Sequence, residues 1–199
     1  MKKITLLFLI LLAGYGTALT QDQSALAGEW QQDLAQMQRT GMIVLGSWAV
    51  GNMAVGGIGM AQTQGVPHYF HQMNLLWNTV NLGIAVGGYL SAASMDPVTG
   101  SVEVLSQYGQ FSKILLLNTG LDVAYVMTGL YLRERSGNVS KHSRRLKGYG
   151  NSLMLQGGFL LAFDLVLVLI NEQAIREMLS AGSFQVAMTP AGMGVQLSF

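Results

Sequence analysis

The stretch "HQMNLLWNTVN" (residues 71–81) is the key to this sequence, because it puts a histidine and three asparagines inside an apolar, glycine-rich run of membrane length. Lipid offers such side chains no hydrogen-bond partner, so they must face other helices or water. At roughly 100° per residue, one stripe of this helix collects all four: His71, Asn74, Asn78 and Asn81. The opposite side repeats small residues every four positions, a pattern that lets helix backbones approach closely: Gly83, Gly87 and Ser91. We expect both faces to be buried, against other helices of the chain or a second copy.

The composition points to a lipid environment. Half of the 199 residues are hydrophobic and only 11% are charged, whereas roughly 25% are charged in an ordinary soluble domain. The hydrophobic residues stand in blocks of about twenty with almost no charge, the length that crosses roughly 30 Å of hydrocarbon. We therefore expect an all-α membrane protein, a four-transmembrane-helix bundle with an N-terminal amphipathic helix and a small C-terminal β-hairpin.

Four segments have the length and composition of spans: residues 41–61, 71–93, 111–132 and 149–170, which together predict a transmembrane domain over residues 41–171. Before them, residues 21–40 have the pattern of an amphipathic helix lying in the membrane interface. Residues 94–110 are rich in turn formers, and the alternating Val102 and Val104 predict an exposed loop with a short strand. Residues 172–199 predict an extracytoplasmic tail, in which a short helix precedes a hairpin of alternating apolar residues.

Two cues predict the orientation in the membrane. Residues 1–20 have the pattern of a bacterial secretory signal peptide, with Lys2 and Lys3 before an apolar run and small residues after it. Whether it is cleaved or kept as an anchor, the polar residues that follow would reach the outer side. Residues 133–147 contain six Lys and Arg residues and a single acid, Glu134. Short loops rich in Lys and Arg stay on the cytoplasmic side of the membrane, where this loop would also contact anionic lipid. We expect an inner-membrane protein with both termini outside.

Polar residues on the other spans add to the stripe. Helical spacing places them on inward faces and gives one candidate polar core: Asn52, Asn74, Asn78, Asn81, Asn118, Asp122 and Asp164. The simplest role of the asparagines is to hold the bundle together by interhelical hydrogen bonds. The aspartates leave three arrangements open, because no Lys or Arg lies at their depth: a protonated acid that donates to an asparagine, a carboxylate in a wet cavity, or a carboxylate that binds a cation.

The sequence contains no metal, nucleotide or catalytic motif. His68 and His71 have an H-x-x-H spacing, but a structural zinc site needs four ligands and a catalytic one three protein ligands. The absence of cysteine removes thiolate sites and disulfides. Two isolated carboxyls without a nucleophile–base pair give little support to an enzyme. We therefore expect no metal, no cofactor and no enzymatic activity. We also expect no binding of nucleic acid, because the net charge is only +1.

Two motifs carry a resemblance. The combination of "WAVGN" (residues 48–52) and "YFHQMNLLWNTVN" (residues 69–81) resembles an uncharacterised family of small bacterial inner-membrane proteins with a signal peptide and four helices. The resemblance extends over residues 25–199 and implies this architecture. It implies no activity and no catalytic residue, because such families have none assigned.

We expect the chain to be embedded in the lipid bilayer, and two functional hypotheses follow. In the first, it is a structural or interaction protein that assembles as a homo-oligomer or with a membrane-protein partner, through the Gly83, Gly87 and Ser91 face or the C-terminal hairpin. In the second, it binds or transports a small solute or cation, using Asp122 and Asp164 within the ring of asparagines. A cation bound to the purified protein would favour the second hypothesis, and a stable stoichiometric partner the first.

Overall fold

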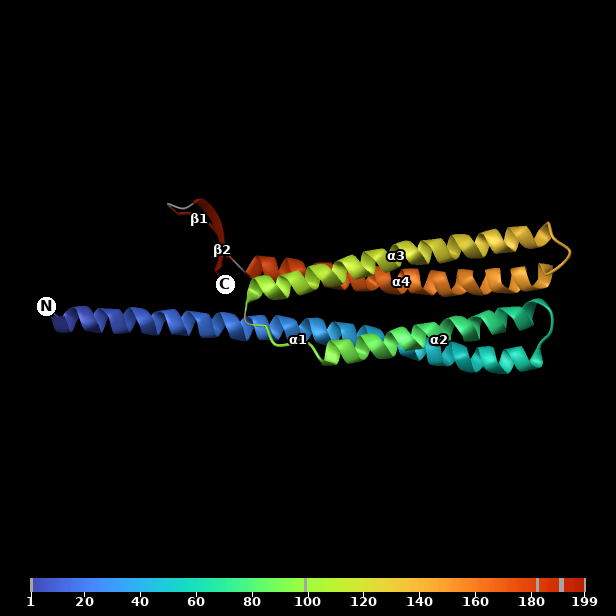
Figure 1. Cartoon of the computed structure of the whole chain (residues 1–199), viewed down its shortest axis with the longest axis horizontal. Coiled ribbons are helices and arrows are strands. Elements are labelled where there is room, and N and C mark those ends of the chain that lie inside the picture. The colour runs from blue at the N-terminus through green and yellow to red at the C-terminus, as the bar shows by residue number, and fades with distance from the viewer. Residues whose placement is uncertain (1, 99, 182, 190–191, 199) are drawn as a thin grey trace. The chain divides into compact units, whose positions relative to one another are not determined.

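The computed structural model describes the backbone of residues 2–98, 100–181, 183–189 and 192–198, and the side chains of residues 24–98 and 100–181. Four helices follow one another along the chain (Figure 1): α1 (Lys2–Gln62), α2 (Val66–Ala93), α3 (Ser101–Gly137) and α4 (Ser143–Ala181). Two strands come after them, β1 (Ser183–Thr189) and β2 (Gly192–Ser198), paired antiparallel with Val186 opposite Val195. The mainly helical fold is as expected. The side chains of the two strands lie outside the described ones, so the role of the hairpin in assembly stays a prediction.

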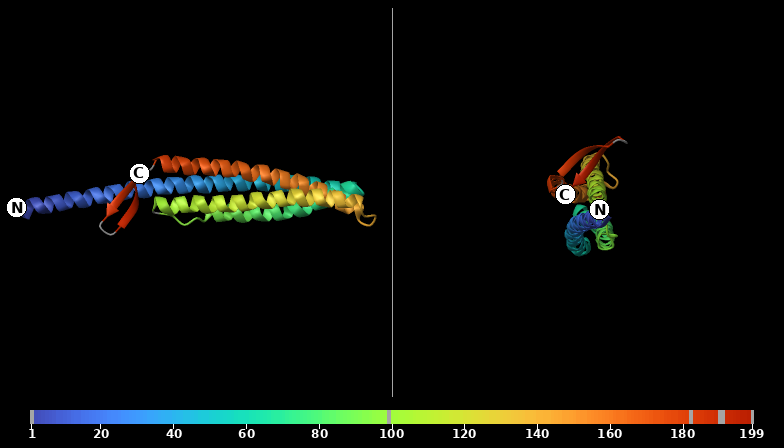
Figure 2. Two further views of the ribbon diagram at one scale, coloured as in Figure 1. Left: turned by 90° about the horizontal axis from the view of Figure 1, so that it is seen from above. Right: turned by 90° about the vertical axis from the view of Figure 1, so that its left-hand side faces the viewer.

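The chain divides into two compact units. The first, here called the bundle, contains Ala35–Met95 and Phe111–Ile170. The second, here called the end unit, contains Met1–Leu34, Asp96–Gln110 and Asn171–Phe199. Within the bundle, α1 and α2 form one helical hairpin and α3 and α4 form another, and the two hairpins lie side by side (Figures 1 and 2). The bundle therefore contains a segment of each of the four helices.

Aromatic contacts join the two hairpins of the bundle. Trp48 of α1 stacks on Phe159 of α4 with ring centroids 3.8 Å apart. Trp77 of α2 packs edge-on against Tyr125 of α3 at 4.7 Å. Buried aromatic side chains contribute a large apolar contact area, so each helix of one hairpin is held to a helix of the other.

The turn between α1 and α2 follows from two residues. Gly65 lies just before α2 with φ 67°, in the left-handed region that favours glycine. Pro67 occupies the first turn of α2, where its missing N–H has no partner to lose. Together they separate the end of α1 from the start of α2, and these two helices form a helical hairpin (Figure 1).

Several expected boundaries are wrong. Residues 101–110 belong to α3 rather than to a loop with a strand, because Val104 and Tyr108, one helical turn apart, are both buried in the end unit. The amphipathic segment 21–40 is continuous with the first span in α1, so it does not form a separate interfacial helix. The short helix expected after the last span is the end of α4.

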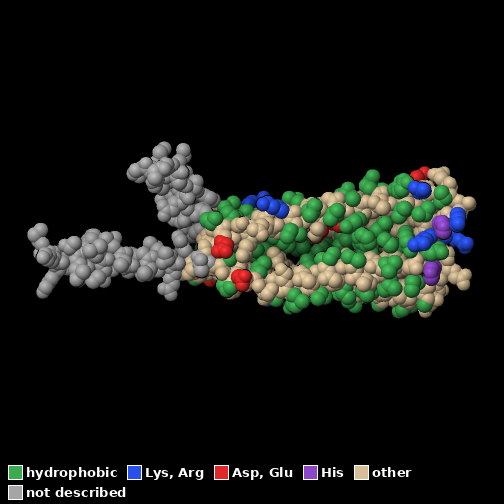
Figure 3. Space-filling view, in the orientation of Figure 1, with side chains coloured by type: hydrophobic (Ala, Val, Ile, Leu, Met, Phe, Trp, Pro, Cys, Tyr) green, Lys and Arg blue, Asp and Glu red, His purple; other side chains and the backbone are tan. Residues whose placement is uncertain are grey.

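The bundle is apolar outside, and its interior holds polar side chains as well as the apolar cluster of Leu45, Ala85 and Leu160. Leu117 and Leu169 are 65% and 66% exposed, whereas Asn78 and Gln156 are fully buried, the reverse of the usual order in a soluble protein. Figure 3 shows hydrophobic side chains over the flank of the bundle. Three helical segments are long and apolar enough to cross a membrane: Ser24–Gln62, Ser101–Gly137 and Ser143–Ala181. Helix α2 is not among them, because its asparagines lower its mean hydropathy.

A carboxyl pair and an amide network in the bundle

An amide network joins three helices in the interior of the bundle. Asn74 of α2 lies at its centre: its Nδ2 donates to Oδ1 of Asn52 on α1 at 3.0 Å, and its Oδ1 accepts a hydrogen bond from Nε2 of Gln156 on α4. Gln156 Oε1 in turn accepts from the indole N–H of Trp48 on α1 at 2.9 Å. Each amide uses both its donor and its acceptor, so the network can hold α1, α2 and α4 in one arrangement.

The network continues along α2. Asn78 Nδ2 donates to the backbone carbonyl of Asn74 at 2.7 Å, and Asn81 Nδ2 lies 3.5 Å from Asn78 Oδ1. All three asparagines are buried, since spacings of four and three residues put them on one face of the helix. His71 begins the same stripe in the sequence, but its ring packs over Gly59 of α1.

The two aspartates meet. Asp122 of α3 and Asp164 of α4 are both buried, and their carboxyl groups are close enough for a side-chain hydrogen bond. Oδ2 of Asp122 is buried without a hydrogen-bond partner. Among the described residues, no Lys, Arg or His has an electrostatic interaction or a hydrogen bond with either carboxyl. Because two adjacent carboxylates repel each other, the pair needs a shared proton or a cation.

Glycine on α4 brings the two carboxyl-bearing helices together. A Cβ atom at Gly157 would lie 3.0 Å from the backbone oxygen of Asp122 and 3.0 Å from the backbone nitrogen of Val126. A larger residue would therefore push α3 away. The carboxyl pair depends on this close approach, which helical periodicity does not predict.

The remaining candidate residues, Asn118 and the small residues of α2, do not take part in the amide network or the carboxyl pair. Asn118 is only half-buried, and no described hydrogen bond joins it to the network. A Cβ at Gly83 or Gly87 would meet nothing within 4 Å, and Ser91 is exposed. This face of α2 is thus not buried within the described chain, and its burial against a second copy stays a prediction. Helix α2 packs instead against glycines of its neighbours, with its Leu75 backbone over Gly56 of α1.

One member of the network is absent from the candidate core. Gln156 is fully buried and links Asn74 to Trp48. The signal for it was available, because Gln156 and Asp164 are eight residues apart and share a helical face. A glutamine in a long apolar run has the same amide donor and acceptor as an asparagine, so it also predicts a buried hydrogen bond.

Comparison with protein families covers this same core. A family model matches residues 44–165, more than half of the chain. The chain belongs to this family of unknown function, DUF6992. The DUF6992 match includes every residue of the amide network and both aspartates, and it agrees with the resemblance to an uncharacterised family. No curated protein and no solved structure matches the chain.

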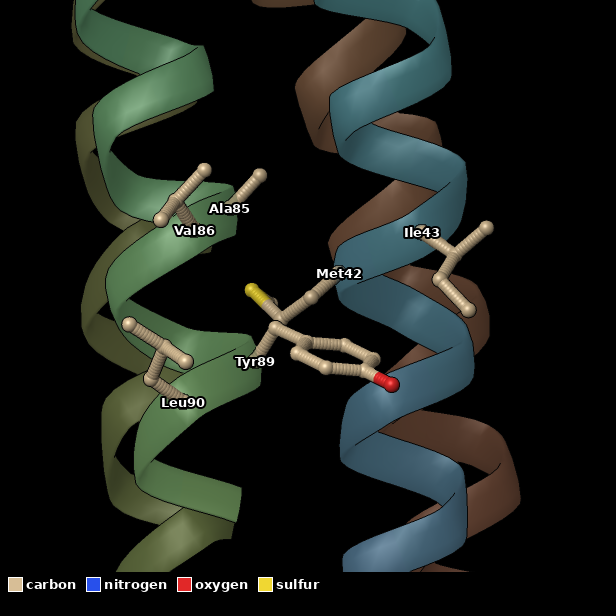
Figure 4. A pocket seen from close by; sticks show the side chains of 6 residues that line it. All are labelled: Met42, Ile43, Ala85, Val86, Tyr89 and Leu90. Atoms are coloured by element: carbon tan, nitrogen blue, oxygen red, sulfur yellow. The ribbon is translucent and has the colours of Figure 1, made fainter. Parts of the chain in front are cut away.

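Two other features of the bundle contribute no polar or metal-binding group to the amide network and the carboxyl pair. An apolar groove of about 200 Å³ between α1 and α2 has one hydroxyl and no charge among its lining residues (Figure 4): Met42, Ile43, Ala85, Val86, Tyr89 and Leu90. Within the described residues, no three His, Cys, Asp or Glu side chains could hold a metal ion together. His68 Nδ1 lies 2.9 Å from the carbonyl of Met60, while His71 contacts Gly59, so the two rings have different partners.

Proposed function

We propose that this chain is an inner-membrane protein that binds a small cation between Asp122 and Asp164, in exchange for the proton that otherwise bridges them. The meeting of two buried carboxyls from α3 and α4 without a basic partner carries the proposal. A pair with one proton has a charge of −1, so binding one monovalent cation releases one proton and leaves the charge unchanged. This is binding or transport chemistry, and it needs no catalytic group.

The apolar outer surface supports the membrane location. Besides the three helices that qualify by length and composition, we place α2 in the membrane as the fourth crossing. Its outward face carries large exposed apolar side chains: Leu76, Val80, Ile84 and Leu90. Its asparagines are buried on the other face, where they need no contact with lipid.

The charges support an orientation. The six cations of residues 133–147 would keep the α3–α4 turn in the cytoplasm. An even number of crossings then puts the mature N-terminus and the C-terminal strands on the outer side. Residues 1–20 would act as the signal that delivers the N-terminus there.

Thermal unfolding of the purified full chain in detergent tests the cation site. Sodium, potassium or calcium chloride would replace choline chloride at constant ionic strength, at several pH values. A ligand that binds the native state increases the free energy of unfolding by mass action, by about 2.7 kcal/mol at a hundredfold excess over Kd, and so raises the melting temperature. We expect one of these cations to raise the melting temperature of the wild type and to release protons, detected with a pH dye in weak buffer.

Matched variants make this test specific. Asp122→Asn and Asp164→Asn each remove one carboxylate of the pair and should abolish both the cation shift and the proton release. Glu134→Gln removes an exposed carboxylate from the same helix as Asp122 and should leave both unchanged. If Asp122→Asn retains the full cation shift, or if no cation stabilises the wild type, the proposed site is wrong.

Assembly is the second candidate function. The observation that favours it is the unused face of α2, where Gly83, Gly87 and Ser91 are exposed. A second copy packed on this face would bring backbones together through the small residues. Gly83→Leu should then halve the mass of the detergent-solubilised protein in light scattering, whereas a monomeric wild type would exclude this route.

A further inference from the structure

A charged surface lies at the end of the bundle where α3 turns into α4. Six basic side chains, all exposed, make up this surface, here called the basic end: Arg133, Arg135, Lys141, Arg144, Arg145 and Lys147. Glu134 is the one acid among residues 131–149. Figure 3 shows Lys and Arg side chains gathered at this end of the molecule. It lies eleven residues beyond Asp122, roughly 16 Å along the axis of α3, so it is separate from the carboxyl pair.

Tyrosine rings hold two of the arginines in place. The guanidinium of Arg145 lies 5.0 Å from the centroid of the Tyr149 ring. Nη1 of Arg135 donates to the Tyr131 hydroxyl at 2.7 Å, and its guanidinium lies 5.9 Å from that ring. Tyr149 is itself fixed by a 2.8 Å hydrogen bond from its hydroxyl to Oε1 of Gln72. Guanidinium groups held in this way lose less conformational entropy when an anion binds.

The turn that carries the cations is closed by its own hydrogen bonds. Ser143 Oγ donates to the carbonyl of Ser136 at 2.6 Å, and the amide of Asn138 donates to the carbonyl of Arg135 at 3.0 Å. The exposed apolar side chains of α3 reach Leu130, and the first cation follows at Arg133. The basic end thus begins where the apolar surface stops, at the depth of lipid headgroups, where tyrosine is also favoured.

We propose that the basic end, with Tyr131 and Tyr149, binds the phosphate groups of anionic membrane lipids. The charge of this surface is complementary to an anionic leaflet, and arginine forms paired hydrogen bonds with phosphate. A net charge of +1 for the whole chain gives little long-range attraction for nucleic acid. The inference rests on the membrane location of the proposed function and is independent of the carboxyl pair.

Lipid titration of the purified full chain in detergent tests this proposal. Thermal stability would be followed while dioleoyl-phosphatidylglycerol or zwitterionic dioleoyl-phosphatidylcholine is added to the micelles, in choline chloride throughout. We expect a saturable rise in melting temperature with phosphatidylglycerol alone, weakened by salt. Arg144→Gln/Arg145→Gln should raise the half-saturating phosphatidylglycerol concentration roughly 30-fold, from about 1 kcal/mol per cation.

A double variant away from the basic end is the matched control. Lys113→Gln/Arg176→Gln also removes two exposed cations and should leave the half-saturating concentration unchanged. Equal stabilisation by both lipids, or an equal loss in both double variants, would overturn the proposal. A rise of the same size with inorganic phosphate would assign the surface to free anions rather than lipid. If Arg144→Gln/Arg145→Gln does not fold, Arg145→Gln alone, with an expected fivefold loss, replaces it.

Discussion

Replacing Gly150 with alanine is expected to force α3 and α4 apart. A Cβ atom at Gly150 would lie 2.6 Å from the carbonyl oxygen of Gly129 and 2.9 Å from the backbone nitrogen of Arg133. Both are backbone atoms, which cannot swing aside like the end of a side chain. Ordinary contact for a Cβ begins at 3.4 Å, so the two helices must separate locally by about 0.8 Å.

The cost of this separation follows from overpacking. Extra atoms in a closely packed interior destabilise proteins by about 1–3 kcal/mol. Alanine also favours a helix over glycine by up to about 1 kcal/mol, which offsets part of the loss. Gly158 is the matched control on the same helix, because a Cβ there would meet nothing within 4 Å. Gly158→Ala gains the helix propensity without the clash, so the difference between the two variants isolates the clash.

Unfolding of both variants in detergent, followed by far-ultraviolet circular dichroism, measures this difference. Gly150→Ala should unfold more readily than Gly158→Ala by about 1–3 kcal/mol. Gly129→Ala should behave like Gly150→Ala, because a Cβ at Gly129 would lie 2.7 Å from the Gly150 carbonyl. If Gly150→Ala and Gly158→Ala are equally stable, α3 and α4 do not approach as described.

Two further substitutions test the polar contacts. Gln156→Leu leaves the Trp48 indole N–H and Asn74 without this partner and should cost about 1–3 kcal/mol in the same unfolding assay; a neutral result would mean that the amide network is not formed. Gln31→Ala removes the hydrogen bonds from Gln31 Nε2 to the carbonyl of Asp96 at 2.7 Å and from the Val98 amide to Gln31 Oε1 at 3.2 Å. Hydrogen exchange of the Val98 amide should then rise on the order of tenfold, and an unchanged rate would contradict this contact in the end unit.

Periodicity along the sequence was enough to predict which side of α2 is polar. Asn74, Asn78 and Asn81 are neighbours on α2 whatever surrounds the helix, because their spacing alone places them on one face. The apolar character of the outer surface agrees with the composition, since half of the residues are hydrophobic and only 11% are charged. Segment boundaries were harder to predict: residues 101–110 have turn formers and alternating valines, yet Val104 and Tyr108 are buried on one face of α3.

The partners of each polar side chain required the tertiary structure. The rotation of one helix about its axis relative to the next depends on where backbones can approach, and Gly157 allows α3 and α4 to come close enough for Asp122 to meet Asp164. The same glycine pattern at Gly83 and Gly87 produces no contact within the described chain, because a small residue permits close packing but does not select the helix that fills the space. The sequence by itself determined that the chain is mainly helical and which side of α2 is polar, because local spacing is enough for both. The packing of the four helices decided the helix bounds near residue 101 and which polar side chains meet.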